Sequence, residues 1–152
     1  MQLVGSAFSR AKQPGDFSWM IDREEFADAL FVFNDNEEQF HAFRTDPHDS
    51  FGCAAGSGNA AIRWYRCVDP PRAAGVPTGS HGRGYPELIS GVRAVIDDAL
   101  AVIDELLGSG RYERVIYSAA ADGQLGTGIF KVGADVRAYI VEGLHRLVDE
   151  TP

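Results

Sequence analysis

The sequence predicts an α/β fold in three layers, with a mostly parallel central sheet flanked by helices. Two short apolar runs, residues 30–33 and 114–118, have the length and composition of buried strands. Two longer segments, residues 86–107 and 134–148, carry apolar residues every three or four positions, as amphipathic helices do. A helix that lies between two consecutive buried strands is typical of a parallel sheet.

The N-terminal region predicts one short helix before the first strand. Residues 1–20 carry scattered apolar side chains, and a hairpin or an extended arm both fit them. Asp22 is placed to cap a helix over residues 23–29, where Glu24 and Glu25 would face the positive end of the helix dipole. The buried strand at residues 30–33 follows directly.

The middle of the chain predicts two long connections separated by a helix. Residues 44–58 are rich in glycine and polar residues, and we expect a loop there. Ser57 and Asn59 are both good helix caps, so a helix is expected to begin near them and to run through Tyr65. Residues 69–86 contain four prolines and four glycines and predict a second long loop.

The clearest predicted helix spans residues 86–107. Pro86 suits its first turn, and Gly108 ends it. Its apolar stripe recurs at spacings of three and four residues and comprises Val92, Ile96, Ala99, Ile103 and Leu106. The final helix, over residues 134–148, presents a similar stripe.

Length and charge limit the classes of function. A chain of 152 residues is typical of one domain, so we expect residues 1–152 to form a single domain. The formal net charge of -8 disfavours nonspecific binding to DNA or RNA, which needs a basic face. No apolar run reaches the ~18–20 residues that a membrane span requires, so we expect no membrane partner.

The cysteines and histidines predict neither a disulfide nor a metal site. Cys53 and Cys67 do not form a C-x-x-C pair and no signal peptide precedes them, so we expect free thiols in a cytoplasmic protein of bacterial type. The four histidines share no spacing typical of metal ligands, and we expect no metal and no cofactor. His81, in a loop, is the histidine best placed to reach a ligand.

The strongest functional feature is the glycine-rich segment that follows the predicted strand 114–118. The candidate ligand-binding residues in it are Asp122, Gly123, Gly126, Thr127, Gly128, Ile129 and Phe130. Ligands of open α/β sheets bind at the carboxyl ends of the strands, where glycines turn backbone N–H groups toward an anion. No Gly-Lys-Ser/Thr follows, so the segment is not a Walker loop. A tight turn that binds nothing is the alternative.

The other predicted strand, residues 30–33, ends in a polar turn. Its three residues are Asn34, Asp35 and Asn36. Since the carboxyl ends of parallel strands share one edge, we expect this turn to lie near the glycine-rich segment. Asn34 is a candidate ligand-binding residue. Asp35 and Asn36 are candidate catalytic residues, because such side chains accept hydrogen bonds from ribose hydroxyls or orient a water. An Asx turn without a ligand is the alternative.

A second glycine-rich loop, residues 52–58, opens the helix predicted near residue 59. Its candidate ligand-binding residues, with those that follow it, are Gly56, Gly58, Asn59 and Arg63. A glycine loop at the start of a helix offers free N–H groups and the positive end of a dipole to a phosphate. Arg63 adds charge or pairs with an acid. The alternative is a flexible linker.

Several of these segments together resemble known families. Residues 31–36, 58–63, 75–79 and 122–130 are similar to those of a small, uncharacterised family of bacterial and phage proteins. More distantly, their order resembles that of macro domains, which bind ADP-ribose. The resemblance implies that Asn34 and Asn36 face the distal ribose and that Gly56 and Gly58 line it. It also implies that residues 126–129 cradle the phosphates.

These observations lead to three hypotheses. In the first, a macro-like protein binds ADP-ribose or a related nucleotide and hydrolyses an ADP-ribosyl or phosphoryl linkage, with Asp35 or Asn36 positioning a water on the ribose. In the second, the same pocket serves a binding module for a nucleotide signal, without turnover. In the third, the protein is structural and has no ligand, and the apolar residues of 1–20 form a homodimer face.

Overall fold

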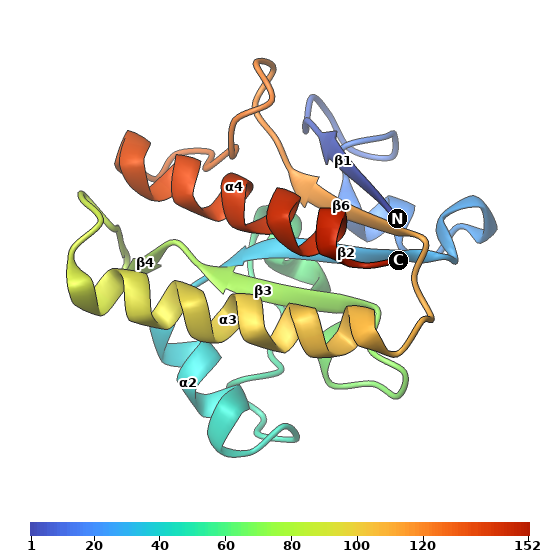
Figure 1. Ribbon diagram of the computed structural model, residues 1–152, viewed down its shortest axis with the longest axis horizontal. Helices are drawn as coiled ribbons and strands as arrows, with labels where there is room; N and C mark the ends of the chain where they lie inside the picture. Colours follow the sequence, from blue (N-terminus) through green and yellow to red (C-terminus); the bar gives the residue numbers. More distant parts are fainter.

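The central sheet contains four strands that all run in the same direction (Figure 1). A computed structural model describes all residues, Met1–Pro152. In their order across the sheet the strands are β1 (Gln2–Ser6), β6 (Arg114–Ser118), β2 (Ala29–Asp35) and β3 (Ala73–Pro77). The predicted α/β class with a parallel sheet is confirmed. The two predicted strands, β2 and β6, are neighbours at the centre of the sheet.

Helices cover both faces of the sheet and produce three layers. The long helices α3 (Ser90–Gly108) and α4 (Ala134–Glu150) lie side by side on one face (Figure 1). The short helix α1 (Phe17–Met20) and the 3₁₀ helix η2 (Gly58–Arg66) pack on the other. The smaller elements are η1 (Glu24–Phe26), α2 (Glu37–Thr45) and a hairpin of β4 (Gly79–Ser80) and β5 (Arg83–Gly84).

Strand β2 contributes to two hydrophobic cores, one on each face. Leu30 and Val32 belong to the core beneath α3 and α4, whereas Phe31 and Phe33 belong to the core beneath α1 and η2. This division follows from the alternation of side chains along a strand. Because both faces are covered, the strand is apolar at every position from 29 to 33, as strands of parallel sheets are.

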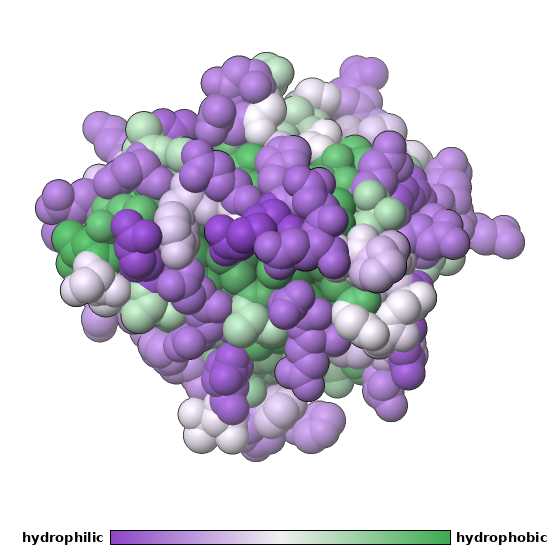
Figure 2. All heavy atoms as spheres, viewed as in Figure 1, coloured by the Kyte–Doolittle hydropathy of each residue, from purple (hydrophilic) through white to green (hydrophobic).

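The predicted apolar stripe of α3 faces the first core. Val92, Ile96, Ala99 and Ile103 are buried, and Leu106 packs against their cluster from a partly exposed position. Hydrophilic residues cover much of the outer surface of α3 and α4 (Figure 2). None of the helices is long and apolar enough to cross a lipid bilayer.

The structure differs from the sequence prediction at several element boundaries. Residues 2–6 form the edge strand β1 rather than an arm or hairpin, and they pair with β6. Residues 37–45 form α2, and the connection predicted over 69–86 contains β3 and the β4–β5 hairpin. Helix α3 begins at Ser90, four residues after Pro86, because residues 86–89 run along the start of α4 instead.

The expectation of free thiols is wrong. Cys53 and Cys67 form a disulfide, with Cα atoms 6.1 Å apart. Cys67 directly follows η2 as its C-cap residue, and Cys53 lies in the loop that precedes this helix. Helix η2 turns back beside that loop, and this return of the chain brings the two cysteines together. Their spacing of 14 residues alone does not reveal the pairing.

Candidate functional site

After the carboxyl ends of β2 and β6 the chain passes to helices on opposite faces of the sheet, in the case of β2 by way of α2, whose Phe40 packs into the core beneath α3 and α4. After β6 the chain enters α4, which covers one face. After β2 it enters α2 and then η2, which covers the other face. Since β2 and β6 are adjacent parallel strands, this is a topological switch point, the usual ligand site of an open α/β sheet.

Asparagine side chains connect the segments that meet at this edge. Asn34, at the end of β2, donates from Nδ2 to the carbonyl oxygen of Gly126 at 2.6 Å. Asn59, at the start of η2, donates from Nδ2 to Ser118 Oγ at 3.3 Å, and its Oδ1 accepts from the N–H of Phe17 at 3.0 Å. The expected meeting of the polar turn with the glycine-rich segment after β6 is therefore present in the structure, and the start of η2 lies at the end of β6.

The loop after β6 spans residues 119–133 and contains two turns. In the first, Asp122 Oδ1 accepts from the N–H of Gln124 at 3.0 Å, and the Gly123 carbonyl accepts from the Tyr117 hydroxyl at 2.6 Å. The positive φ of Gly123, 84°, is one that glycine adopts readily. Asp122 and Gly123 thus shape the loop through internal contacts.

The second turn of this loop presents unpaired backbone donors. The N–H of Phe130 donates to the carbonyl of Thr127, which closes the turn, and Gly128 in its middle has a φ of 59°. The N–H groups of Thr127, Gly128 and Ile129 have no acceptor within the protein. Phe130 is half exposed and Ile129 is 93% exposed, so two apolar side chains stand beside these donors.

The start of η2 presents a second set of unpaired donors. The N–H groups of Ser57, Gly58 and Asn59 have no acceptor within the protein, as expected at the first turn of a helix. Gly58 has a φ of 57°. The N–H of Gly56, in contrast, donates to the carbonyl of Ala60 at 3.0 Å, and Gly56 packs against the guanidinium of Arg63.

Asp35 and Arg63, two of the predicted site residues, are buried in an ionic cluster. Asp35 Oδ1 lies 3.1 Å from Arg63 Nε, and Oδ2 pairs with Arg66. The exposed fractions of the three side chains are 0%, 4% and 2%, in the order Asp35, Arg63, Arg66. Burial lowers the pKa of Arg66, and the charge of Asp35 opposes this. The Asp35 carboxylate therefore serves as the counter-ion of two buried cations.

The arginines of this cluster also hold the first glycine loop. Arg66 donates to the carbonyls of Gly52 and Gln39, and Arg63 donates to that of Ala54 at 3.1 Å. With the disulfide, these bonds fasten the loop to η2. Sequence reasoning missed Arg66. The signal was its position three residues after Arg63, which places both side chains on one face of a 3₁₀ helix.

Asn36, the other candidate catalytic residue, caps helix α2. Its Oδ1 accepts from the N–H of Gln39 at 2.8 Å, and its Nδ2 donates to Gln39 Oε1 at 2.6 Å. The first contact is an N-cap hydrogen bond to the residue three positions later, and the second joins the two side chains. Asn36 is thus engaged locally, as in the alternative that needs no ligand.

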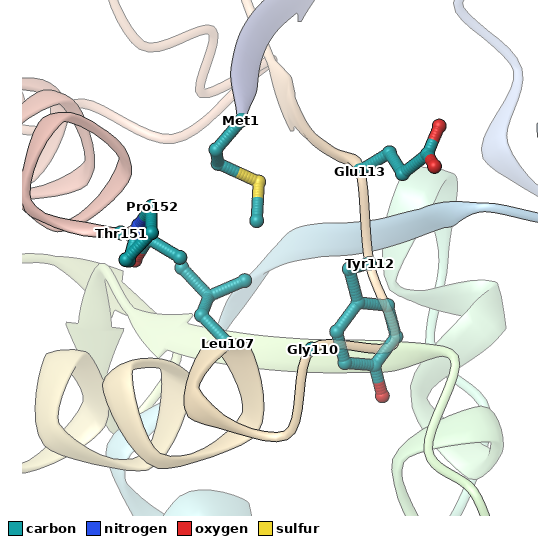
Figure 3. A pocket seen from close by; sticks show the side chains of 7 residues that line it. All are labelled: Met1, Leu107, Gly110, Tyr112, Glu113, Thr151 and Pro152. Carbon is teal, nitrogen blue, oxygen red and sulfur yellow. The ribbon is translucent and has the colours of Figure 1, made fainter.

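Two recesses of the surface lie away from this edge. One, of about 590 Å³, is lined by Asp22, Arg23, Glu24 and Glu25. The other, of about 420 Å³, lies at the opposite edge of the sheet, where Met1, Leu107 and Tyr112 form its apolar wall (Figure 3). Neither contains a predicted site residue. What the carboxyl edge offers a ligand is its set of unpaired backbone donors.

The chain matches no protein-family model, no curated protein and no solved structure. The resemblance to macro domains accordingly stays a prediction. The basis for a functional proposal is therefore the set of unpaired donors and side-chain contacts at the carboxyl ends of β2 and β6.

Proposed function

We propose that the protein binds a phosphate-bearing nucleotide, of the ADP-ribose or ADP type, at the carboxyl edge of β2 and β6. The observation that carries this proposal is the group of three consecutive unpaired N–H groups at Thr127, Gly128 and Ile129. Consecutive N–H groups in a glycine turn form a concavity that suits an oxyanion. Their position at a topological switch point is the usual one for a phosphate.

Further contacts at the same edge support a nucleotide rather than a free phosphate. The unpaired donors of Ser57, Gly58 and Asn59 belong to the second loop, which Asn59 connects to the end of β6. Two sets of donors suit a diphosphate. The half-exposed ring of Phe130 stands beside the first set, where an aromatic base can stack on it.

The contacts of Asp35 favour a binding module over a hydrolase. A general base needs a carboxylate within hydrogen-bonding reach of the proton that it removes. Asp35 has no exposed side-chain surface, and Arg63 and Arg66 occupy its two oxygens. Binding without turnover, with the ligand held by backbone donors, is therefore the function that we propose.

Calorimetric titration with ADP, ADP-ribose and NAD tests this proposal. For the wild-type protein we expect saturable heat with at least one of the three. In Gly128→Ala, a side chain at a φ of 59° strains the turn that aims the three donors, and affinity is expected to fall about tenfold, the equivalent of one hydrogen bond. Gly110→Ala is the matched control.

Gly110 has a similar φ of 75° and, like Gly128, open space around its Cβ position, but it lies beside the recess at the opposite edge. Both variants are expected to lose about 1 kcal/mol of stability, and only Gly128→Ala should lose affinity. Absence of heat from the folded wild-type protein with all three nucleotides would refute the proposed function. Equal affinity losses in the two variants would refute the assignment to this turn. Product formation during the titration would show that the protein is a hydrolase.

A further inference from the structure

The disulfide between Cys53 and Cys67 is within reach of solvent. Both cysteines are partly exposed, and the chain contains no others. Thiol–disulfide exchange depends on the access of a thiolate to one of the sulfur atoms, and exposed disulfides are the more labile ones. Any thiol–disulfide exchange within this protein therefore takes place at this one bond.

The disulfide fastens the loop over residues 52–56 to the end of η2. Cys53 lies in this loop, and Cys67 directly follows η2. Beside this link, the guanidinium of Arg66 donates to the carbonyl of Gly52, the residue before Cys53, at 2.7 Å. A covalent bond and a hydrogen bond from the same end of the helix therefore hold adjacent residues of the loop.

The same loop covers the buried ionic cluster. The carbonyl of Ala54 accepts from Arg63 at 3.1 Å, and the Cβ position of Gly56 is only 2.7 Å from a guanidinium nitrogen of Arg63. With the bond from Arg66 to Gly52, these contacts place the loop directly against both guanidinium groups, whose side chains are only 4% and 2% exposed. Displacement of the loop would admit water to the cluster.

The charges beneath the loop favour its displacement. Burial takes the two guanidinium groups and the Asp35 carboxylate out of water, and this desolvation opposes the closed position of the loop. The hydrogen bonds to the loop carbonyls offset part of that cost, and the disulfide adds a covalent restraint. Loss of the restraint shifts the balance toward an open loop, because a chain that is tied across 14 residues has fewer open conformations than a free one.

We propose that the disulfide is a redox switch. It holds the loop 52–56 closed over Arg63 and Arg66, and its reduction by a dithiol opens the loop and exposes the two guanidinium groups to solvent. The switch is independent of the proposed function, because no ligand takes part in it.

The reduction proceeds by two exchanges of a sulfur–sulfur bond. A thiolate of the dithiol attacks Cys53 Sγ and forms a mixed disulfide, while the bond to Cys67 breaks and Cys67 leaves as a thiolate that takes up a proton. The second thiol of the dithiol then attacks the mixed disulfide and gives its proton to the departing Cys53 sulfur. Two electrons pass to the protein, and the dithiol becomes a disulfide.

Chemical modification of arginines by phenylglyoxal, quantified by mass spectrometry, measures the opening. The full-length wild-type protein is compared with Cys53→Ser/Cys67→Ser, which lacks the bond. The rates at Arg63 and Arg66 should rise about tenfold or more in the variant, a part of the roughly hundredfold effect of a link across 14 residues. Arg72, which donates to two backbone carbonyls outside this loop, is the internal control and should keep its rate.

NMR of the ¹⁵N-labelled wild-type protein with dithiothreitol tests the redox step itself. Reduction should shift the amides of residues 52–58 and the side-chain N–H signals of Arg63 and Arg66, and reoxidation should restore them. The double serine variant should not respond to dithiothreitol. Unchanged modification of the two arginines would overturn the switch, as would shifts confined to Cys53, Cys67 and their direct neighbours. An equal rise at the control arginine would also overturn it, because the bond would then hold the whole fold rather than one loop.

Discussion

Replacement of Asp35 by asparagine is the perturbation that most sharply separates a structural role from a catalytic one. The substitution keeps the shape of the side chain and removes its charge. Arg63 and Arg66 then remain in the interior, at 4% and 2% exposure, without a counter-ion. An amide of the same shape accepts a hydrogen bond from one of them at most, because its nitrogen is a donor.

The expected cost follows from the burial of all three groups. Removal of one partner from a buried ionic cluster costs about 3–5 kcal/mol, because the charges left behind are desolvated and unpaired. The whole stability of a domain is only about 5–15 kcal/mol. Asp35→Asn is therefore expected to lose about a fifth or more of the free energy of unfolding, whether or not a ligand is present.

Urea denaturation followed by circular dichroism measures this loss. Asp104→Asn, an exposed acid of α3, is the matched control and should stay within about 0.5 kcal/mol of the wild-type protein. The double variant Asp35→Asn/Arg66→Met should lose less than the sum of the two single variants, since each removes the same interaction. A loss below about 1 kcal/mol in Asp35→Asn would refute the view that this carboxylate balances two buried cations.

Three further predictions concern the disulfide, Glu38 and Asn34. Replacement of Cys53 and Cys67 by serine removes a link across 14 residues and should cost about 3 kcal/mol in urea denaturation; an unchanged midpoint would contradict this. Burial opposes the ionisation of Glu38, but its hydrogen bonds with Ser80 and the backbone of His81 outweigh this and lower its pKa below 4.5. A carboxylate whose pKa is lowered in the folded state stabilises the protein above pH 4.5, and this stabilisation is lost as the pH falls and the group is protonated. Glu38→Gln should therefore be less stable than wild type at pH 7 and equal to it near pH 2. A gap that persists at pH 2 would count against this. Asn34→Ala frees the carbonyl of Gly126 and should weaken nucleotide binding in calorimetry more than it lowers stability, whereas an unchanged affinity would show that this tether does not position the turn.

The sequence predicts the elements whose burial is uniform. Strands β2 and β6 are covered on both faces, so nearly every residue in them is apolar and the run is visible. Helices α3 and α4 each bury one stripe, which gives a clear helical period. The predicted start of α3 was less accurate. Pro86 suits the first turn of a helix, but the segment before Ser90 contacts α4 instead, and α3 begins at Ser90.

The elements that escaped prediction have weaker patterns. β1 is an edge strand with no fully buried residue, and β3 reads Ala-Ala-Gly-Val-Pro, in which no side chain is large and apolar except Val76. In β3, Gly75 is required because a Cβ there would come within 3 Å of Asp35 Oδ2 and of Phe33. Such packing constraints arise from contacts between distant segments, which a local pattern does not contain.

The candidate site was predictable in its backbone but not in its side-chain partners. The glycine pattern predicted the loop over residues 122–130 that contains the turn at Thr127–Phe130, because glycine content reports local conformation directly. The engagement of Asp35 depends on Arg66, 31 residues away, and the disulfide depends on the return of η2. A charged residue at a strand end fits a site and a buried ion pair equally well, and only the three-dimensional contacts distinguish the two.

The most direct test of ligand binding at the carboxyl edge is a ¹⁵N NMR titration of the wild-type protein with ADP. The amides of Ser57–Asn59 and Thr127–Ile129 should shift in a saturable way, because these are the donors that lack a partner. Residues around the recess at the opposite edge, such as Leu107 and Tyr112, should not shift. Shifts confined to that recess, or no shifts at millimolar ADP, would contradict the account.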